Sequence, residues 1–230
     1  MSESEKLTVE VNQTDSVTAF LYPAAKQSKL DTTIILGHGA GANQLHPFMR
    51  LFAAGLAQRG LDAVTFNFVY TEKGKGAPDP KAKLESCYKA VIDSATRHKR
   101  LKSNRLLIGG KSMGGRIASQ VAAEGDDRIA GLVFLGYPLH PPGQPQKLRT
   151  DHWPLIKVPM LFVQGTRDSL GTPDEIKPFV KKLKLNASIY VIETGDHSFK
   201  VQKSAGVEQD VVYARVMDRI VEWALMSDTL

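Results

Sequence analysis

Short apolar runs alternate along the chain with longer stretches in which apolar residues recur at helical spacing. This alternation is typical of βαβ units, and it predicts an α/β fold with a mostly parallel sheet of about eight strands and helices on both faces. Alternating apolar residues at 7–11 and 17–23, separated by turn residues, predict an antiparallel hairpin before the parallel strands. The six parallel strands are expected at 32–39, 62–68, 105–110, 129–136, 159–165 and 188–193.

Helices are expected in the segments that join these strands. In the first of them, apolar residues recur at helical spacing and Gly60 marks the end. The expected helices cover 45–59, 83–98, the segment beginning at 116, 174–184 and a stretch within 207–226. Residues 71–83 contain two prolines, two glycines and four lysines without an apolar period, which predicts a solvated loop.

Composition is ordinary for a globular protein and narrows the classes of partner. The 230 residues are 42% apolar and 23% charged, which fits one α/β domain over 1–230. The net charge is +6, from 30 Lys and Arg against 24 Asp and Glu. Its basic clusters at 73–83, 97–102 and 177–184 lie on separate elements and are not interleaved with aromatic residues, so no nucleic-acid partner is expected.

The cysteine content and the N-terminal sequence indicate the cellular compartment in which the protein is expected. Cys87 is the only cysteine, so neither an intramolecular disulfide nor a cysteine-rich zinc site can form, and a reducing, cytoplasmic compartment is expected. The N-terminus is polar, and no segment approaches the run of about 18 apolar residues that a membrane span requires. The sequence therefore predicts neither export nor a membrane partner.

The strand at 105–110 runs into the pattern Gly110-Lys111-Ser112-Met113-Gly114. In a G-x-S-x-G turn between a strand and a helix, the glycines allow a tight bend and the serine is strained and exposed. This motif requires a strand before it and a helix after it, and both are expected here. Ser112 is therefore a candidate nucleophile.

The same segment also contains Gly-Lys-Ser, which ends a P-loop. A P-loop needs a further glycine five positions before Gly110, where this chain has Arg105 inside an apolar strand. The nucleotide-hydrolysis interpretation is therefore excluded.

The glycine-rich loop at 37–42 has two interpretations. Gly37, Gly39 and Ala42 satisfy the dinucleotide-binding pattern, but the carboxylate expected at the C-terminal end of the next strand is missing, because Asp62 lies at its N-terminal end. The favoured alternative is an oxyanion-hole loop of the His-Gly type, in which His38 braces the loop.

A serine nucleophile needs an imidazole base and a carboxylate that orients it. Asp168 follows the strand at 159–165 and His197 follows the strand at 188–193, where sites form in open α/β sheets. Asp174 is the alternative acid, and Asp196 is expected to bond locally. No H-x-x-x-H motif or carboxylate cluster appears, so neither a metal nor another cofactor is expected.

With His38-Gly39, Ser112 in its glycine turn, Asp168 and His197 in this order, the chain resembles the α/β-hydrolase superfamily from residue 32 to the last helix. The resemblance implies Ser112 as nucleophile, His197 as general base and then acid, and Asp168 as the orienting carboxylate. It also implies an oxyanion hole made by the backbone N–H groups of Ala40 and Met113.

Within the superfamily the chain looks like the compact dienelactone-hydrolase-like branch. The segments 37–44 and 109–116 resemble a small testis-expressed hydrolase-like family related to a subunit of a nonspecific-lethal histone acetyltransferase complex. Dienelactone hydrolases proper carry cysteine at the elbow, where this chain has Ser112, so the resemblance does not extend to lactone specificity.

The connection at 137–158 is too short for a bulky lid, so a minimal lid or none is expected. Tyr137 and Leu139 are predicted to line the substrate pocket with His38 and Gly39, although the connection has the alternative role of packing over the sheet edge. The leading hypothesis is a serine hydrolase of small carboxylic esters or thioesters that works through an acyl-enzyme. The alternative is a catalytically idle scaffold for protein interaction.

Overall fold

The computed structural model describes residues 4–226 and contains an eight-stranded sheet in the order β1-β2-β4-β3-β5-β6-β7-β8. The strands are β1 (Glu5–Glu10), β2 (Ser16–Tyr22), β3 (Thr32–Gly37), β4 (Asp62–Phe66), β5 (Arg105–Lys111), β6 (Ile129–Leu135), β7 (Met160–Gly165) and β8 (Ala187–Ile192). β1 and β2 form an antiparallel hairpin, and β2 pairs antiparallel with β4. All other pairings are parallel. The predicted hairpin and six parallel strands are thus confirmed.

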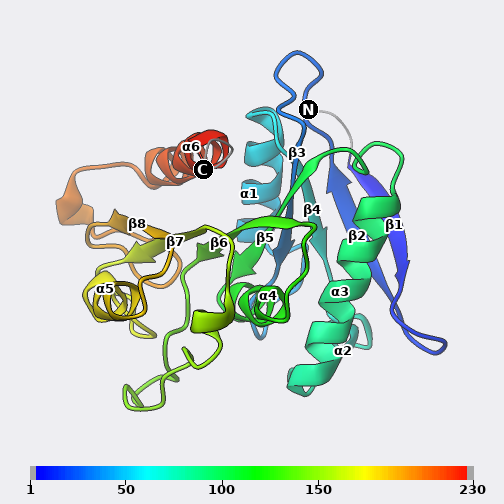
Figure 1. The fold of residues 1–230 in the computed structure, drawn as a ribbon. Coiled ribbons are helices and arrows are strands. Elements are labelled where there is room, and N and C mark those ends of the chain that lie inside the picture. Colours follow the sequence, from blue (N-terminus) through cyan, green and yellow to red (C-terminus); the bar gives the residue numbers. More distant parts are fainter. Residues whose placement is uncertain (1–3, 227–230) are drawn as a thin grey trace.

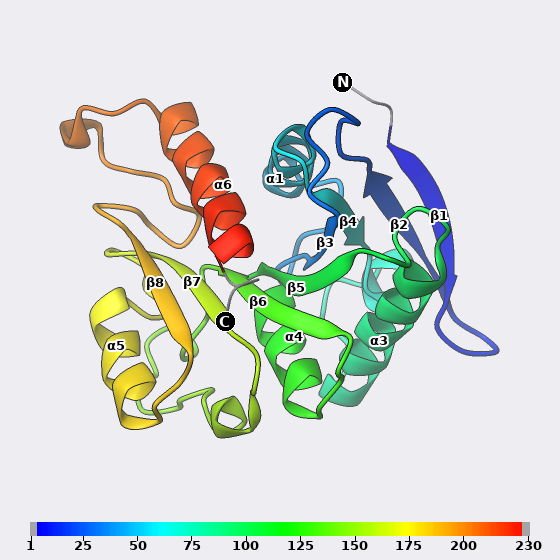
Figure 2. The same cartoon turned by 45° about the horizontal axis from the view of Figure 1, so that its top comes forward.

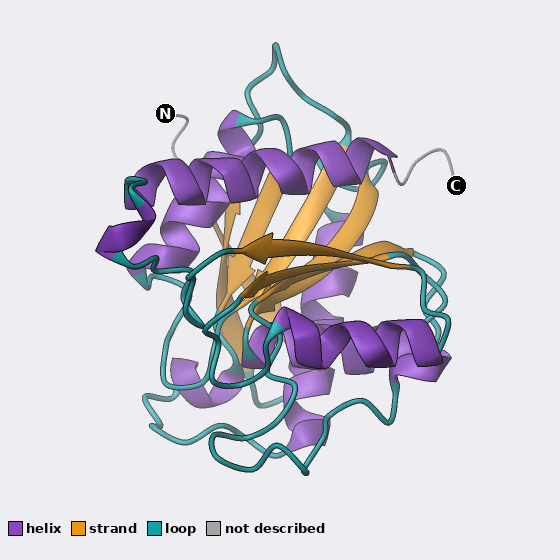
Figure 3. Cartoon of the chain, turned by 90° about the vertical axis from the view of Figure 1, so that its left-hand side faces the viewer, coloured by secondary structure: helices purple, strands orange, loops and turns teal. Residues whose placement is uncertain are grey.

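Helices cover both faces of this sheet (Figures 1 and 3). They are α1 (Pro47–Gln58), α2 (Val69–Glu72), α3 (Lys81–Arg97), α4 (Met113–Ala123), α5 (Pro173–Lys182) and α6 (Gln209–Met226), with 3-10 turns at Trp153–Leu155 and Lys203–Ala205. α3, α4 and α5 lie on one face, and α1 and α6 lie on the other. No helix within residues 4–226 is long and apolar enough to cross a membrane.

Two apolar cores result, one on each face of the sheet. The core under α3 and α4 includes a cluster of aromatic rings formed by Phe134, Tyr137, Trp153 and Phe162. The core under α1 and α6 includes Trp223. The strands β3 to β7 are buried on both faces, which explains why their sequences are nearly continuous apolar runs.

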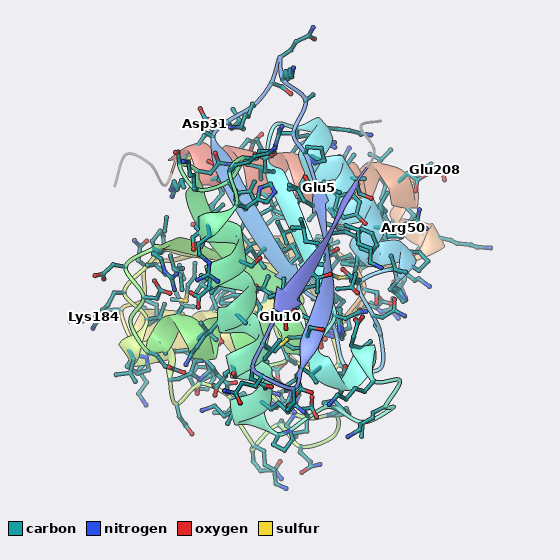
Figure 4. The ribbon with its side chains drawn as sticks, turned by 90° about the vertical axis from the view of Figure 1, so that its right-hand side faces the viewer. Glu5, Glu10, Asp31, Arg50, Lys184 and Glu208 are labelled. Carbon is teal, nitrogen blue, oxygen red and sulfur yellow. The ribbon has the colours of Figure 1, made fainter. Side chains whose placement is uncertain are left out.

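The two edges of the sheet differ in their charge. β1 forms one edge and carries Glu5 and Glu10, the two residues labelled at its ends in Figure 4. Charged side chains on an edge strand oppose pairing with another chain. β8 forms the other edge, between α5 and α6 (Figure 2), and five of its six residues are only half-buried.

The predicted solvated loop at 71–83 is shorter than expected, because α2 ends at Glu72 and α3 begins at Lys81. Lys73 in this loop and Lys83 in the first turn of α3 form ion pairs with Asp15 in the turn between β1 and β2. These two lysines hold the pKa of the Asp15 carboxyl down at about 2.

The thiol of Cys87 is buried on α3, and this burial raises its pKa to about 12. Because the thiolate is the reactive species, we expect the native protein to react with a disulfide reagent at pH 8 at least about 10³-fold more slowly than the unfolded chain. Absorbance at 412 nm after adding Ellman's reagent, with and without denaturant, measures both rates. Since the chain has no other cysteine, rapid reaction of the native protein would contradict this prediction.

Candidate functional site

Ser112 occupies the sharp turn between β5 and α4. Its backbone has φ 51° and ψ −113°, a conformation that costs a residue with a side chain about 1–3 kcal/mol. The N–H of Ser112 donates to the carbonyl of Leu135 at 3.2 Å, which ties the turn to the end of β6. Helix α4 begins at Met113, three residues earlier than expected, so its N-terminus lies directly at the serine.

Glycines around this turn allow the end of β3 to touch it backbone to backbone. A Cβ atom on Gly110 would lie 2.2 Å from the carbonyl oxygen of Gly37, and one on Gly114 would lie 2.1 Å from the same oxygen. A Cβ atom on Gly39 would lie 3.6 Å from Cβ of Ser112. The loop after β3 therefore lies against the serine turn, as an oxyanion loop must.

Two N–H groups at this junction are free to donate. Within residues 4–226, neither the N–H of Ala40 nor that of Met113 has a hydrogen-bond acceptor. Ala40 is exposed, and Met113 is the first residue of α4, where helical N–H groups have no partner of their own. Both are suited to bind an oxygen atom that becomes negative during a reaction.

His38 is fully buried and connects this loop to the end of β4. Its Nε2 accepts the N–H of Phe68 at 3.2 Å, so Nδ1 carries the proton and donates to the carbonyl of Gly39 at 2.8 Å. Burial lowers the pKa of His38 to about 4, and the ring is therefore neutral at pH 7. These contacts fit the predicted bracing role, whereas the buried ring does not reach a solvent-filled pocket.

The predicted acid and base meet at the ends of two neighbouring strands. Nδ1 of His197 and Oδ2 of Asp168 are 2.7 Å apart. Asp168 follows β7 and is 1% exposed, and His197 follows β8. Their loops touch, because a Cβ atom on Gly165 would lie 2.2 Å from the carbonyl oxygen of Gly195.

The other two candidate acids have different partners. Asp174 is exposed and forms an ion pair with Lys177 at 2.9 Å. Oδ1 of Asp196 accepts the N–H groups of Ser198 and Lys200, which stabilises the turn around His197. The structure therefore pairs His197 with Asp168 and not with Asp174, and Asp196 bonds locally as predicted.

The imidazole of His197 lies beside the serine turn with one nitrogen unpaired. Its Cε1 would lie 3.3 Å from a Cβ atom on Gly136, the residue that follows Leu135 at the end of β6. Nε2 is buried and has no hydrogen-bond partner among residues 4–226, so it is not bonded to Ser112 in this structure. Catalytic hydrogen bonds are often long before substrate binds, and an unpaired Nε2 is the state required of a base.

A buried glutamine that the sequence analysis missed orients the acid. Nε2 of Gln164 donates to Oδ2 of Asp168 at 2.8 Å, and its Oε1 accepts the N–H of Tyr137 at 2.8 Å. The signal in the sequence was a glutamine inside the otherwise apolar strand at 159–165. Such a group is buried only when its polar atoms are bonded.

Tyr137 and Leu139 do not line a pocket as predicted. They are 0% and 1% exposed, and the hydroxyl of Tyr137 donates to the carbonyl of Arg149 and accepts from the indole of Trp153. Tyr137 instead packs in the core against Phe134 of β6 and Phe162 of β7, inside the edge strand β8 and not over the sheet edge. Between β6 and β7 the only helical element is the 3-10 turn at Trp153–Leu155, so no lid helix is present in that segment.

The dinucleotide interpretation is not supported. The carboxylate of Asp62 is fully buried at the start of β4, where it accepts hydrogen bonds from Arg100 and Asn104. It therefore cannot bind a ribose at the opposite end of the strand. Among residues 4–226, no group of three or more His, Cys, Asp or Glu residues is placed to hold a metal ion.

Comparisons with known proteins agree with this architecture. The model of a family described as "Alpha/beta hydrolase domain" matches residues 30–225. An alpha-beta serine hydrolase homologue from Coxiella burnetii is similar with 20% identity and a TM-score of 0.73, covering 95% of this chain and 96% of its own. A dienelactone hydrolase from Anabaena variabilis gives 19% identity, a TM-score of 0.76 and 97% coverage of both chains. A serine hydrolase without lid from Xanthomonas campestris has 17% identity and a TM-score of 0.75, covering 97% of this chain and 96% of its own.

Proposed function

Since this chain belongs to the alpha/beta hydrolase domain family, we propose that it is a serine hydrolase that cleaves small carboxylic esters or thioesters through an acyl-enzyme. The observation that carries this proposal is the pair of His197 and Asp168, 2.7 Å apart, beside a serine held in a strained turn. Acyl transfer requires a nucleophile, a base, an acid that orients the base, and N–H donors for the oxyanion, and the site offers a candidate for each.

In the proposed reaction, Oγ of Ser112 attacks the acyl carbon while Nε2 of His197 accepts the hydroxyl proton. Asp168 stabilises the resulting imidazolium through the hydrogen bond at Nδ1. The N–H groups of Ala40 and Met113 bind the oxyanion of the tetrahedral intermediate. The intermediate collapses to the acyl-enzyme, and His197 returns the proton to the departing alcohol or thiol. Water then attacks the acyl carbon by the same route, which releases the acid and restores Ser112.

The proposed preference for small substrates rests on the short connection between β6 and β7, which forms no lid helix. The similar proteins from Xanthomonas campestris and Anabaena variabilis are described as a serine hydrolase without lid and a dienelactone hydrolase. Because this chain has serine at the elbow, we place it in the compact dienelactone-hydrolase-like branch without proposing a lactone as its substrate.

A place in the testis-expressed hydrolase-like family and a cytoplasmic location are proposals of the same kind. The first rests on the segments 37–44 and 109–116. The second rests on the single, buried Cys87, which suits a reducing compartment.

Labelling with a fluorophosphonate tests the proposed function, because this reagent needs an activated serine, a working base and an oxyanion hole. We expect one adduct, located on Ser112 by peptide mass spectrometry, and hydrolysis of short p-nitrophenyl esters. Ser86→Ala is the control, since Ser86 is exposed on α3 and its loss should not change labelling. A folded protein that neither reacts nor hydrolyses these esters would instead favour the idle scaffold.

A further inference from the structure

Lys111 is the last residue of β5 and immediately precedes Ser112, yet its side chain reaches the loop of the proposed base. Its Nζ donates a hydrogen bond to the backbone carbonyl of His197 at 2.6 Å. The ammonium also lies 5.9 Å from the centres of the Phe48 and Phe199 rings. Within residues 4–226 the ammonium makes no ion pair, and the carbonyl of His197 is its one hydrogen-bond partner.

Lys111 also lies close to the imidazole of His197. A Cβ atom on Gly136 would be 3.0 Å from Nζ of Lys111 and 3.3 Å from Cε1 of His197. The ammonium and the ring therefore both lie against the same point at the end of β6. A change at Lys111 acts directly on the position and the charge around the proposed base.

Lys111 is half-buried, and placing its amine in this partly dry position does not serve stability. Removing an ammonium from water is costly, and burial lowers the pKa of Lys111 to about 7, although the charges of Asp168 and Asp196 oppose this shift. A methionine of similar length could fill the space between the two phenylalanine rings without that cost. The hydrogen bond to His197 is the contact that methionine could not make.

We propose that Lys111 is a positioning residue, whose amine holds the carbonyl of His197 and thereby fixes the imidazole relative to Ser112. This inference rests on the proposed function. The imidazole is then held at two points, by Asp168 at Nδ1 and by Lys111 through the backbone. Because Lys111 and Ser112 are adjacent, the end of β5 fixes both the nucleophile and the base.

The first test compares Lys111→Met with the wild type. We expect kcat to fall about 10- to 100-fold, because misplacing a catalytic group by about 1 Å can cost about 10²-fold, while KM changes less than about twofold. Stability in urea should stay equal or rise. The rise should be largest below pH 7, where the wild-type amine is charged in its half-buried position, whereas the unfolded chain holds that proton at no cost up to its ordinary pKa near 10.5. Lys177→Met is the control, since Lys177 is exposed on α5.

The second readout is the pH dependence of kcat/KM. The charged or titratable groups facing Lys111 are Asp168 from the loop after β7, and Asp196 and His197 from the loop after β8, while α1 contributes the uncharged ring of Phe48. A cation beside an imidazole disfavours the imidazolium, so the acid limb should move to higher pH in Lys111→Met. It should stay in place in Lys177→Met, and Lys111→Arg should restore it at least in part.

A crystal structure of Lys111→Met provides a readout that does not depend on turnover. We expect the main chain at His197 and its ring to be displaced from the wild-type positions. An unchanged His197, an unchanged kcat, or a joint loss of stability and kcat with an unmoved acid limb would each overturn the proposal. Failure of the proposed function itself would look different, because the wild type would then not react with a fluorophosphonate.

Discussion

Replacing Ser112 with alanine is expected to lower kcat/KM for a short p-nitrophenyl ester by about 10⁴-fold or more. Without Oγ no acyl-enzyme can form, and only the oxyanion hole and substrate binding still assist the attack of water. The fold should be unaffected, because alanine keeps the Cβ atom and its strain at φ 51°. Initial rates with matched enzyme concentrations, together with urea unfolding curves, measure the two effects separately.

Ser119→Ala is a matched control for this experiment. Ser119 lies on the same helix, and its hydroxyl bonds the carbonyl of Arg116 and the ring of His152 rather than Asp168 or His197. We expect its activity to stay within about threefold of the wild type. If Ser112→Ala kept a tenth of the wild-type rate or more, Ser112 would not be the nucleophile.

Replacing Gly114 with alanine is expected to lower the free energy of unfolding by at least about 3 kcal/mol, the upper part of the range for overpacking. The new Cβ atom would lie 2.1 Å from the carbonyl oxygen of Gly37 and 2.3 Å from its carbonyl carbon. These are backbone atoms of the central strand β3, so they cannot move aside as a flexible side chain would. Urea unfolding followed by tryptophan fluorescence measures the change.

Gly76→Ala is the control, because nothing lies within 4 Å of its added Cβ atom and its φ is not positive. Its free energy of unfolding should change by less than about 0.5 kcal/mol. A Gly114→Ala protein as stable as the control would show that β3 and α4 can separate at this point. The oxyanion loop would then be less closely tied to Ser112 than the contacts indicate.

The sequence predicted which elements form, because buried parallel strands have continuous apolar sequences and the helices between them have apolar residues at helical spacing. It did not predict the order in which the strands lie side by side in the sheet. β4 lies between β2 and β3 because Ala19 to Tyr22 pair with Phe66 to Ala63, a contact between distant segments. Helix α2 was also missed, since four residues are too few to show a helical period.

For the site, order along the chain was sufficient to find the three candidates, because loops after parallel strands collect at one edge of the sheet. Position after the strand favoured Asp168 over Asp174, but it could not show which of the two side chains meets His197. It also assigned Tyr137 to a pocket, although an aromatic residue after a strand suits a core equally well. The role of Lys111 could not be predicted from its place in the glycine turn, since its contact with His197 joins residues 86 positions apart.

The position of β8 at the edge of the sheet has a consequence for the assembly of the site. Ser112 and its strained turn belong to the central strands, whereas His197 follows a half-buried strand that pairs with β7 alone. The strands around Ser112 therefore precede in the chain the segment that supplies the base. In the proposed enzyme, the nucleophile is inert until β8 docks, and local fraying of that edge would switch a finished molecule off without melting its cores.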